Sequence, residues 1–253
     1  MGANDDLALE AQLAAIQKRS DTLTAAQLGT LYQGLVSQEL ARCAHDGQRW
    51  LRYVTTKDEA DSLRPVKPFP LDLPYLLDLW SIIHLHQALV IAKSRQMLLS
   101  WLLACYCVWR ARFKPNQAIY WQTKAWDDAV AMVAMPAGGV MGRCQFIEEN
   151  LPPWMRVAYK PSEGRIQYPN GSLIQALAGG GDKIRGKVVS VLVEDEFAHQ
   201  EDQEGVHTAV LPLIQKGAKV IFVSSPNQAN LFCTLYHGYP MGQAPTSDVV
   251  APA

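Results

Sequence analysis

Apolar and polar positions along the chain alternate in blocks that favour strands and helices in turn. Four short apolar runs of the kind that form buried strands lie at 88–92, 118–122, 188–193 and 218–223. Segments with helical periodicity separate the first pair and the last pair of these runs. Near-continuous apolar strands that alternate with helices are typical of a mostly parallel sheet covered on both faces. The pattern therefore predicts an α/β fold that binds its ligands at the carboxyl ends of the strands.

The first part of the chain has a different pattern. Residues 5–19 and 24–45 carry apolar positions three and four apart, which predicts two helices. The segment 62–74 contains four prolines and reads as a linker, and a further helix is expected at 74–86. We therefore expect a small helical appendage over 1–60.

The remaining chain divides into a core and a tail. The core is expected at 61–240, with a disordered tail at 241–253. Within the core, the segment 165–178 contains Asn170-Gly171, which is a typical hairpin turn between two strands.

Composition narrows the class of protein. The 253 residues are 49% hydrophobic and 19% charged, as in an ordinary globular protein. Lys and Arg number 23 against 24 Asp and Glu, so net charge gives no argument for nucleic-acid or membrane binding, and any DNA contact needs a local basic patch. The five cysteines form no CxxC pair, and we expect them to be reduced and structural. Without a signal peptide or a long apolar run, an intracellular soluble protein is expected.

The loop after the first apolar run has the outline of a phosphate-binding (Walker A) loop. Aligned on Ser100, the standard pattern would place glycine at 93 and 98 and lysine at 99, whereas this chain has Lys93, Leu98 and Leu99. Ser100 offers a hydroxyl for Mg²⁺ at the start of a helix, and Lys93 and Arg95 offer cations for phosphates. Taken alone, the motif is weak and is better interpreted as a strand–loop–helix turn with surface charges.

The third apolar run ends in three acids, Glu194, Asp195 and Glu196. An apolar strand that ends in Asp-Glu is how nucleoside triphosphatases (Walker B) place one carboxylate beside Mg²⁺ and a second beside the attacking water. Acids at a buried strand end are costly without a cation nearby. The alternative is an acidic loop that is open to water.

The fourth apolar run is followed by Ser224-Ser225-Pro226-Asn227. Small hydroxyl residues at such a strand end can sense the γ-phosphate, although the stretch alone reads as a turn. The glycine-rich loop 179–187 carries basic residues suited to DNA or to a neighbouring subunit, and an ordinary loop is the alternative. The histidines lack metal-ligand spacing and are interpreted as structural; those considered are His84, His86, His199 and His207.

Taken in this order, the loop from Lys93 to Ser100, the acids at 194–196 and the serines at 224–225 resemble the ATPase domain of a tailed-bacteriophage large terminase. The resemblance covers about residues 50–240. It implies a P-loop NTPase fold of the ASCE/RecA-like type, with ATP and Mg²⁺ as cofactors. It further implies a motor that moves double-stranded DNA into a procapsid in the cytoplasm of the infected bacterial host. The implied partners are the portal protein, the small terminase subunit and further copies of the chain in a ring, without a membrane.

The resemblance also implies roles for single residues. Lys93, Arg95 and Glu196 are implied to be catalytic, and Ser100 and Asp195 to be the Mg²⁺ ligands. Terminases commonly have a loop of the form K-x-R-Q-x-G-x-S, in which Lys93 matches the phosphate lysine. The residues implied to bind the nucleotide are Lys93, Ser94, Arg95, Gln96, Met97, Leu98, Leu99, Ser100, Ser224 and Ser225.

Leu98 departs from this form, which has glycine there. Because leucine is unfavourable at positive φ, we expect either a different backbone path at this position or weak nucleotide binding.

The sequence alone leaves two questions open. A helicase-like ATPase, or a degenerate domain that only binds DNA or the portal, are alternatives to the motor. A trans-acting arginine cannot be chosen among Arg143, Arg156, Arg165 and Arg185. By the resemblance, Ser224 and Ser225 are the coupling serines, which match the family's motif that links hydrolysis to movement. The sequence shows no nuclease domain after them, so DNA cleavage by this chain is not expected.

Overall fold

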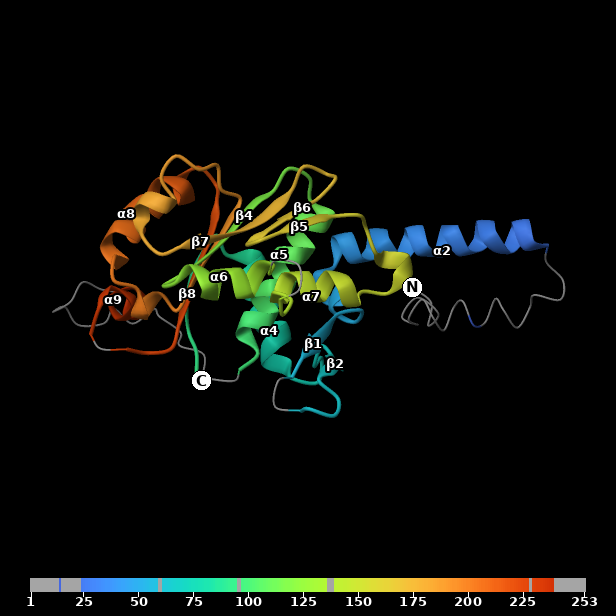
Figure 1. Cartoon of the computed structure of the whole chain (residues 1–253), viewed down its shortest axis with the longest axis horizontal. Helices are drawn as coiled ribbons and strands as arrows, with labels where there is room; N and C mark the ends of the chain where they lie inside the picture. The colour runs from blue at the N-terminus through green and yellow to red at the C-terminus, as the bar shows by residue number, and fades with distance from the viewer. Residues whose placement is uncertain are drawn as a thin grey trace.

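The computed structural model describes residues 24–58, 61–94, 97–135, 139–227 and 229–238, together with Ala14. Its centre is a seven-stranded sheet in the order β3-β9-β8-β4-β7-β6-β5 (Figure 1). Neighbouring strands from β3 to β7 are parallel, and β6 and β5 are antiparallel additions. The strands are β3 (Ala88–Ala92), β9 (Lys219–Ser224), β8 (Val191–Asp195), β4 (Ala118–Thr123), β7 (Leu173–Ala178), β6 (Arg165–Gln167) and β5 (Lys160–Ser162). The predicted α/β fold with a mostly parallel sheet is confirmed.

Helices cover both faces of this sheet, because its strands are apolar on both sides. In β8, Val191 and Val193 belong to one buried cluster and Leu192 belongs to the other. The first face is covered by α4 (Pro74–Leu85), α5 (Leu99–Phe113), α6 (Trp126–Val133) and α7 (Arg143–Asn150). The second is covered by α8 (Gln203–Gln215), α9 (Leu231–His237) and the short 3-10 helix η4 (Phe197–His199). Two other 3-10 turns are η2 (Pro153–Met155) and η3 (Gly181–Lys183).

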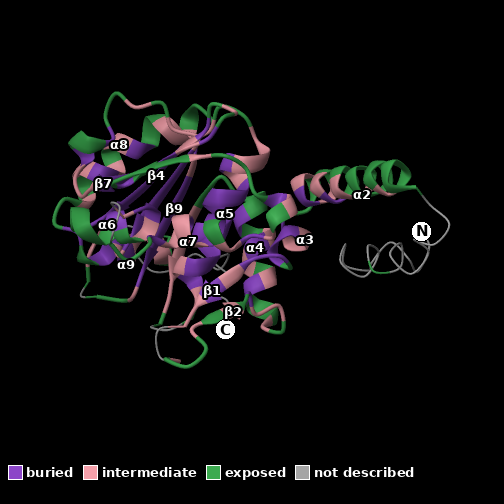
Figure 2. Ribbon diagram, turned by 45° about the vertical axis from the view of Figure 1, so that its right-hand side comes forward, coloured by how far each residue is buried: buried purple, intermediate pink, exposed green. Residues whose placement is uncertain are grey.

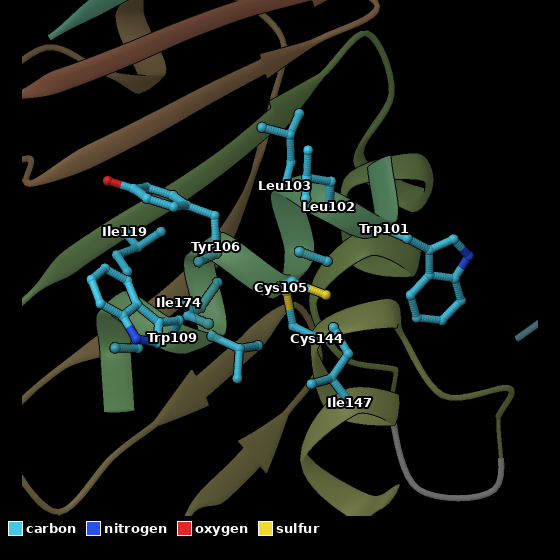
Figure 3. Close-up of a cluster of buried hydrophobic side chains, with 14 of the residues drawn as sticks. Trp101, Leu102, Leu103, Cys105, Tyr106, Trp109, Ile119, Cys144, Ile147 and Ile174 are labelled. Carbon is cyan, nitrogen blue, oxygen red and sulfur yellow. The ribbon is translucent and has the colours of Figure 1, made fainter. Parts of the chain in front are cut away.

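Helix α5 is the centre of the larger cluster and begins directly after the phosphate-loop segment. It is buried nearly all round, from Trp101 to Trp109 without interruption, which is typical of a helix enclosed by a core. Figure 3 shows side chains of α5 packed with Ile119 and Ile174 of the sheet and with Cys144 and Ile147 of α7. The loop therefore rests on a helix that has little freedom to move.

The N-terminal helix α2 (Ala25–His45) extends away from the sheet, and its first half is largely exposed (Figures 1 and 2). Its last turns are fixed to the body through Glu39, which accepts a hydrogen bond from Arg49 at 2.7 Å and from the Tyr53 hydroxyl at 2.8 Å. The helix predicted at 24–45 is confirmed, whereas the one predicted at 5–19 lies outside the described residues.

The segment between α2 and α4 differs from the expected linker. After α3 (Gly47–Leu51), strands β1 (Thr55–Lys57) and β2 (Val66–Pro68) pair antiparallel, so part of the proline-rich stretch is a small hairpin. Pro68 is tolerated because this two-stranded sheet leaves edge positions free of ladder bonds. Cys43, Trp50 and Leu51 lie in the main cluster, and the division near residue 60 stays a prediction.

The hairpin predicted around Asn170-Gly171 is confirmed, since β6 pairs antiparallel with β7 and Gly171 has φ +84°. Within the described ranges, none of the helices combines the length and apolarity needed to span a bilayer.

Candidate active site

Three carboxyl strand ends meet at one edge of the sheet. Strand β9 comes last in the chain but lies between β3 and β8, so the residues that follow these strands are neighbours. They open into a cleft of about 1110 Å³. The cleft is lined by Lys93, Ser94, Met97, Leu98, Leu99 and Ser100 from the loop, by Glu196, His199, Ser225 and Pro226 from the other two ends, and by Thr56, Lys57, Asp58, Lys67, Pro68, Pro70, Trp101, Lys124, Asp128 and Arg143.

The ammonium group of Lys93 joins the loop to the acids of β8. Its Nζ lies 3.0 Å from Asp195 Oδ1, 3.2 Å from Glu196 Oε1 and 3.4 Å from Ser100 Oγ. The Lys93 side chain is 12% exposed and that of Asp195 is 5% exposed, so this ion pair is largely shielded from water. Because buried charges need partners, the lysine and the acids stabilise one another in the absence of any ligand.

The same oxygen atoms fit a magnesium ion. Mg²⁺ in nucleotide sites takes one or two protein oxygens and completes its shell with water and phosphate oxygens. Ser100 Oγ and Asp195 Oδ1 offer a hydroxyl and a carboxylate, and Lys93 already holds a positive charge between them. Among the described residues, no group of three or more His, Cys, Asp or Glu side chains could hold a metal ion.

Leu98 takes the conformation that the loop pattern assigns to glycine. It is the N-cap of α5, with φ 54° and ψ 9° in the left-handed region. Of the two alternatives expected for Leu98, the structure therefore does not show a different backbone path, and weak nucleotide binding stays a prediction. A left-handed leucine costs roughly 1–2 kcal/mol, and the partly buried side chain, which packs against the main cluster, offsets part of this cost. The loop keeps its turn because the core holds Leu98 from behind.

The remaining residues of this segment differ in their exposure and in their contacts. Ser94 is exposed and lines the cleft, and the Met97 carbonyl accepts a hydrogen bond from the Tyr75 hydroxyl at 3.1 Å. Leu99 is 5% exposed and belongs to the core, so it presents mainly backbone to the cleft. Arg95 and Gln96 lie outside the described residues.

The two coupling serines point in different directions. Ser224 has no exposed surface, and its hydroxyl accepts a hydrogen bond from the Ala198 amide at 3.1 Å, so this side chain supports the strand end and does not line the cleft. Ser225 lines the cleft, and its hydroxyl donates to Glu196 Oε2 at 3.3 Å.

Sequence reasoning missed His199, which it interpreted as structural. The ring Nε2 lies 3.1 Å from Ser225 Oγ and 3.8 Å from Glu196 Oε2, and the residue lines the cleft. The available signal was its spacing, because Glu196 and His199 are three residues apart, the distance of one helical turn.

Glu194 lies in different surroundings from its two acidic neighbours. Its side chain is fully buried, and its Oε2 accepts a hydrogen bond from Gln200 at 3.1 Å. Burial raises the pKa of Glu194 to about 8, and the Gln200 hydrogen bond lowers it only in part. Within the described residues, three buried oxygens nearby have no hydrogen-bond partner: Oε1 of Glu194, of Gln122 and of Gln200. Burial therefore favours the protonated form of this carboxyl, which can donate a hydrogen bond to an amide oxygen.

The candidate arginines are spread over the surface. Arg143 lines the cleft of its own chain, with its guanidinium 5.4 Å from the centre of the Trp101 ring. Arg185 has a side chain that is 60% exposed and pairs with Asp182 at 2.8 Å. Arg156 donates to the Leu151 carbonyl and Arg165 to Gln167.

The chain matches no protein-family model and no curated protein sequence. Among solved structures it is similar to the HK97 bacteriophage large terminase, with TM-score 0.51 and 14% identity over 77% of this chain and 40% of that chain. It is also similar to the Thermus phage P74-26 large terminase ATPase domain, with TM-score 0.48 and 14% identity over 69% of this chain and 76% of that one. The large terminase from the thermophilic bacteriophage D6E in complex with ADP has TM-score 0.43 and 12% identity, over 60% and 38% of the two chains. At 14% identity, the likeness to the HK97 bacteriophage large terminase, with its TM-score of 0.51, establishes the fold alone: this chain has an α/β fold similar to part of that phage large terminase.

Proposed function

We propose that this chain is an ATP-hydrolysing motor of viral DNA packaging, the ATPase domain of a terminase large subunit. One observation carries the proposal. The Lys93 ammonium group, which follows β3, lies 3.4 Å from the hydroxyl of Ser100 in the first turn of α5, 3.0 Å from Asp195 and 3.2 Å from Glu196 at the end of β8. A cation, a hydroxyl, a metal-binding carboxylate and a second carboxylate in one cleft are the groups that phosphoryl transfer to water requires.

Lys93 has two alternative partners. Without nucleotide, its ammonium group neutralises Asp195 and Glu196. When ATP enters the cleft, the oxygens of its β- and γ-phosphates would offer the Lys93 ammonium group new anionic partners, and the ammonium group would turn toward them. Asp195 and Ser100 would then hold Mg²⁺, which would supply positive charge to the phosphate oxygens.

Glu196 is the group that orients the attacking water. It follows β8 in a left-handed conformation with φ 51°, which turns its side chain out of the strand and into the cleft. Strained backbone of this kind is found at active sites, where the surrounding structure holds it. A carboxylate that is 42% exposed can accept a proton from water, which the buried Glu194 cannot do.

Double-stranded DNA, a portal protein and a small terminase subunit are the proposed partners, with copies of the chain arranged in a ring in the infected bacterial cytoplasm. The support for these partners is the sequence resemblance, together with a fold shared with the HK97 large terminase.

The test is phosphate release from ATP by the purified chain, with Mg²⁺ and double-stranded DNA. We expect hydrolysis that stops when Mg²⁺ is chelated and that falls by roughly a hundredfold or more in Lys93→Ala, because the phosphate charge loses its cation. Lys216→Ala, which removes an exposed lysine at the end of α8, is the matched control and keeps the wild-type rate.

Two results would contradict the proposal. Wild-type protein that binds DNA but neither binds nor hydrolyses ATP favours the degenerate binding domain. Hydrolysis that persists in Lys93→Ala places the reaction elsewhere in the molecule.

A further inference from the structure

Behind the Glu196 carboxylate lies a short chain of side chains from two strand ends. Ser225, which follows β9, donates to Glu196 Oε2 at 3.3 Å. His199, the last residue of η4, has its Nε2 3.1 Å from the same serine oxygen. Both residues line the cleft with Glu196.

The direction of these hydrogen bonds follows from the number of protons. An ionised carboxylate only accepts, so the single hydroxyl proton of Ser225 must point to Glu196. The serine oxygen then has only lone pairs left for His199, and the imidazole must donate to it through an Nε2–H. The order is therefore His199 to Ser225 to Glu196, with two donors in series that end on one carboxylate oxygen. Donors in such series polarise one another and strengthen the last bond.

The other carboxylate oxygen of Glu196, Oε1, has a different partner. Glu196 Oε1 contacts Lys93 at 3.2 Å, the partner that turns to the phosphates when ATP is bound. From that moment Oε1 is free to accept from water, and Oε2 is the atom through which the protein holds the half-exposed side chain. The orientation of the Glu196 carboxylate therefore depends on Ser225 and on His199, which donates to that serine.

We propose that His199 is a positioning residue, which acts through Ser225 to fix the Glu196 carboxylate in the orientation that holds the attacking water. This inference rests on the proposed ATP hydrolysis at this site.

The backbone around His199 is suited to such a role. The Ala198 carbonyl accepts hydrogen bonds from Asn227 at 3.1 Å and from Asn230 at 2.9 Å, and the Ala198 amide donates to Ser224. Phe197, in the same turn, is fully buried against Phe222 with ring centres 4.6 Å apart. The turn that carries His199 is therefore tied to the end of β9, and movement there reaches Glu196 directly.

The experiment compares steady-state ATP hydrolysis by the full chain in four variants: His199→Ala, His199→Gln, Ser225→Ala and the His199→Ala/Ser225→Ala double variant. We expect His199→Ala to lower kcat roughly tenfold with KM unchanged, the effect of one lost hydrogen bond to a charged network. His199→Gln, whose amide can donate to Ser225, recovers most of the rate. The double variant is no slower than Ser225→Ala, because both residues act on one oxygen.

His207→Ala removes another histidine, on α8, and is the matched control with the wild-type rate. Circular dichroism and a thermal melt verify that each variant is folded.

Several results would overturn the inference. One is an active wild type with unchanged kcat in a folded His199→Ala, and another is a loss that falls on KM alone, which would mean a contact to the nucleotide. Multiplying losses in the double variant would show that the two residues act separately. A wild type without hydrolysis overturns the proposed function as well, so the two failures are distinguishable.

Discussion

Glu194 and Glu196 are two residues apart, yet they occupy opposite environments. Glu194 is fully buried among the amides of Gln122 and Gln200, whereas Glu196 opens into the cleft, where Lys93 contacts it at 3.2 Å. Alternation along a strand would place both side chains on the same face of the sheet. They separate because β8 ends at Asp195 and the left-handed backbone of Glu196 redirects its side chain.

The difference between these two environments determines which of the acids can take part in catalysis. A carboxyl group with only neutral amides around it keeps its proton, since its charged form would be desolvated without compensation. A carboxylate beside a cation stays ionised and can bind a metal or accept a proton. In this protein, alternation along β8 separates Asp195 from Glu194, whereas Glu196 reaches the cleft because the strand has ended before it.

The largest expected effect is the contrast between two isosteric changes. Glu196→Gln lowers ATP hydrolysis by roughly a hundredfold or more, because the amide cannot accept the proton of the attacking water. Glu194→Gln stays close to the wild-type rate, since burial favours the neutral form of that carboxyl and its side chain does not line the cleft. Phosphate release measures the rate, and nucleotide titration verifies that both variants still bind ATP. Equal losses in the two variants would remove the distinction.

The next effect concerns the cation between the acids. Without nucleotide, Lys93→Met leaves Asp195 buried and unpaired, and we expect a loss of about 3 kcal/mol in the free energy of unfolding. Adding Asp195→Asn removes the unpaired charge and restores part of that loss. Urea denaturation of the single and double variants measures the loss in the free energy of unfolding and its partial recovery. A Lys93→Met protein as stable as wild type would mean that the ion pair between Lys93 and Asp195 does not stabilise the protein without nucleotide.

Glu194 should also make stability depend on pH. Its pKa is raised from 4.5 to about 8 in the folded protein. Between these values the unfolded chain releases a proton that the folded chain keeps, so its contribution to stability falls as pH rises, by up to about 1.4 kcal/mol per pH unit. Wild type and Glu194→Gln should be similarly stable below pH 4.5, and the variant more stable near pH 8.

Urea denaturation over this pH range measures the difference between the two proteins. A difference that does not change with pH would place the Glu194 carboxyl in contact with water or with a cation.

The smallest effect tests the strained turn that carries the loop. Leu98→Ala and Leu98→Gly remove the same packing against the core, but only glycine relieves the left-handed conformation. We expect the glycine variant to be more stable than the alanine variant by about 1 kcal/mol. Guanidinium denaturation measures the difference, and equal stabilities would show that position 98 carries no backbone strain.

Strands were the most predictable part of this fold. The run 88–92 coincides with β3, because alternation with polar loops marks both of its ends. The run 188–193 was placed too early, since β8 covers Val191–Asp195 and Val188 is 82% exposed. A periodicity argument cannot separate an exposed valine from a buried one. The hairpin of β1 and β2 was missed because four prolines in 62–74 outweighed the short strand between them.

The candidate site also has features that the sequence predicted and features that it did not predict. The sequence by itself determined which groups end the strands: a lysine, a hydroxyl and two carboxylates that need one another electrostatically. It also determined that position 98 departs from glycine, since a leucine can be read directly.

Only the tertiary structure decided how these groups meet. Strand β9 enters the sheet between β3 and β8, and this brings Ser225 and His199 to Glu196. Strand order depends on how helices and strands far apart in the chain pack together, and a local pattern does not encode it. The same holds for Leu98, whose left-handed turn is maintained by the core beneath it, and for Glu194, whose proton is kept by burial.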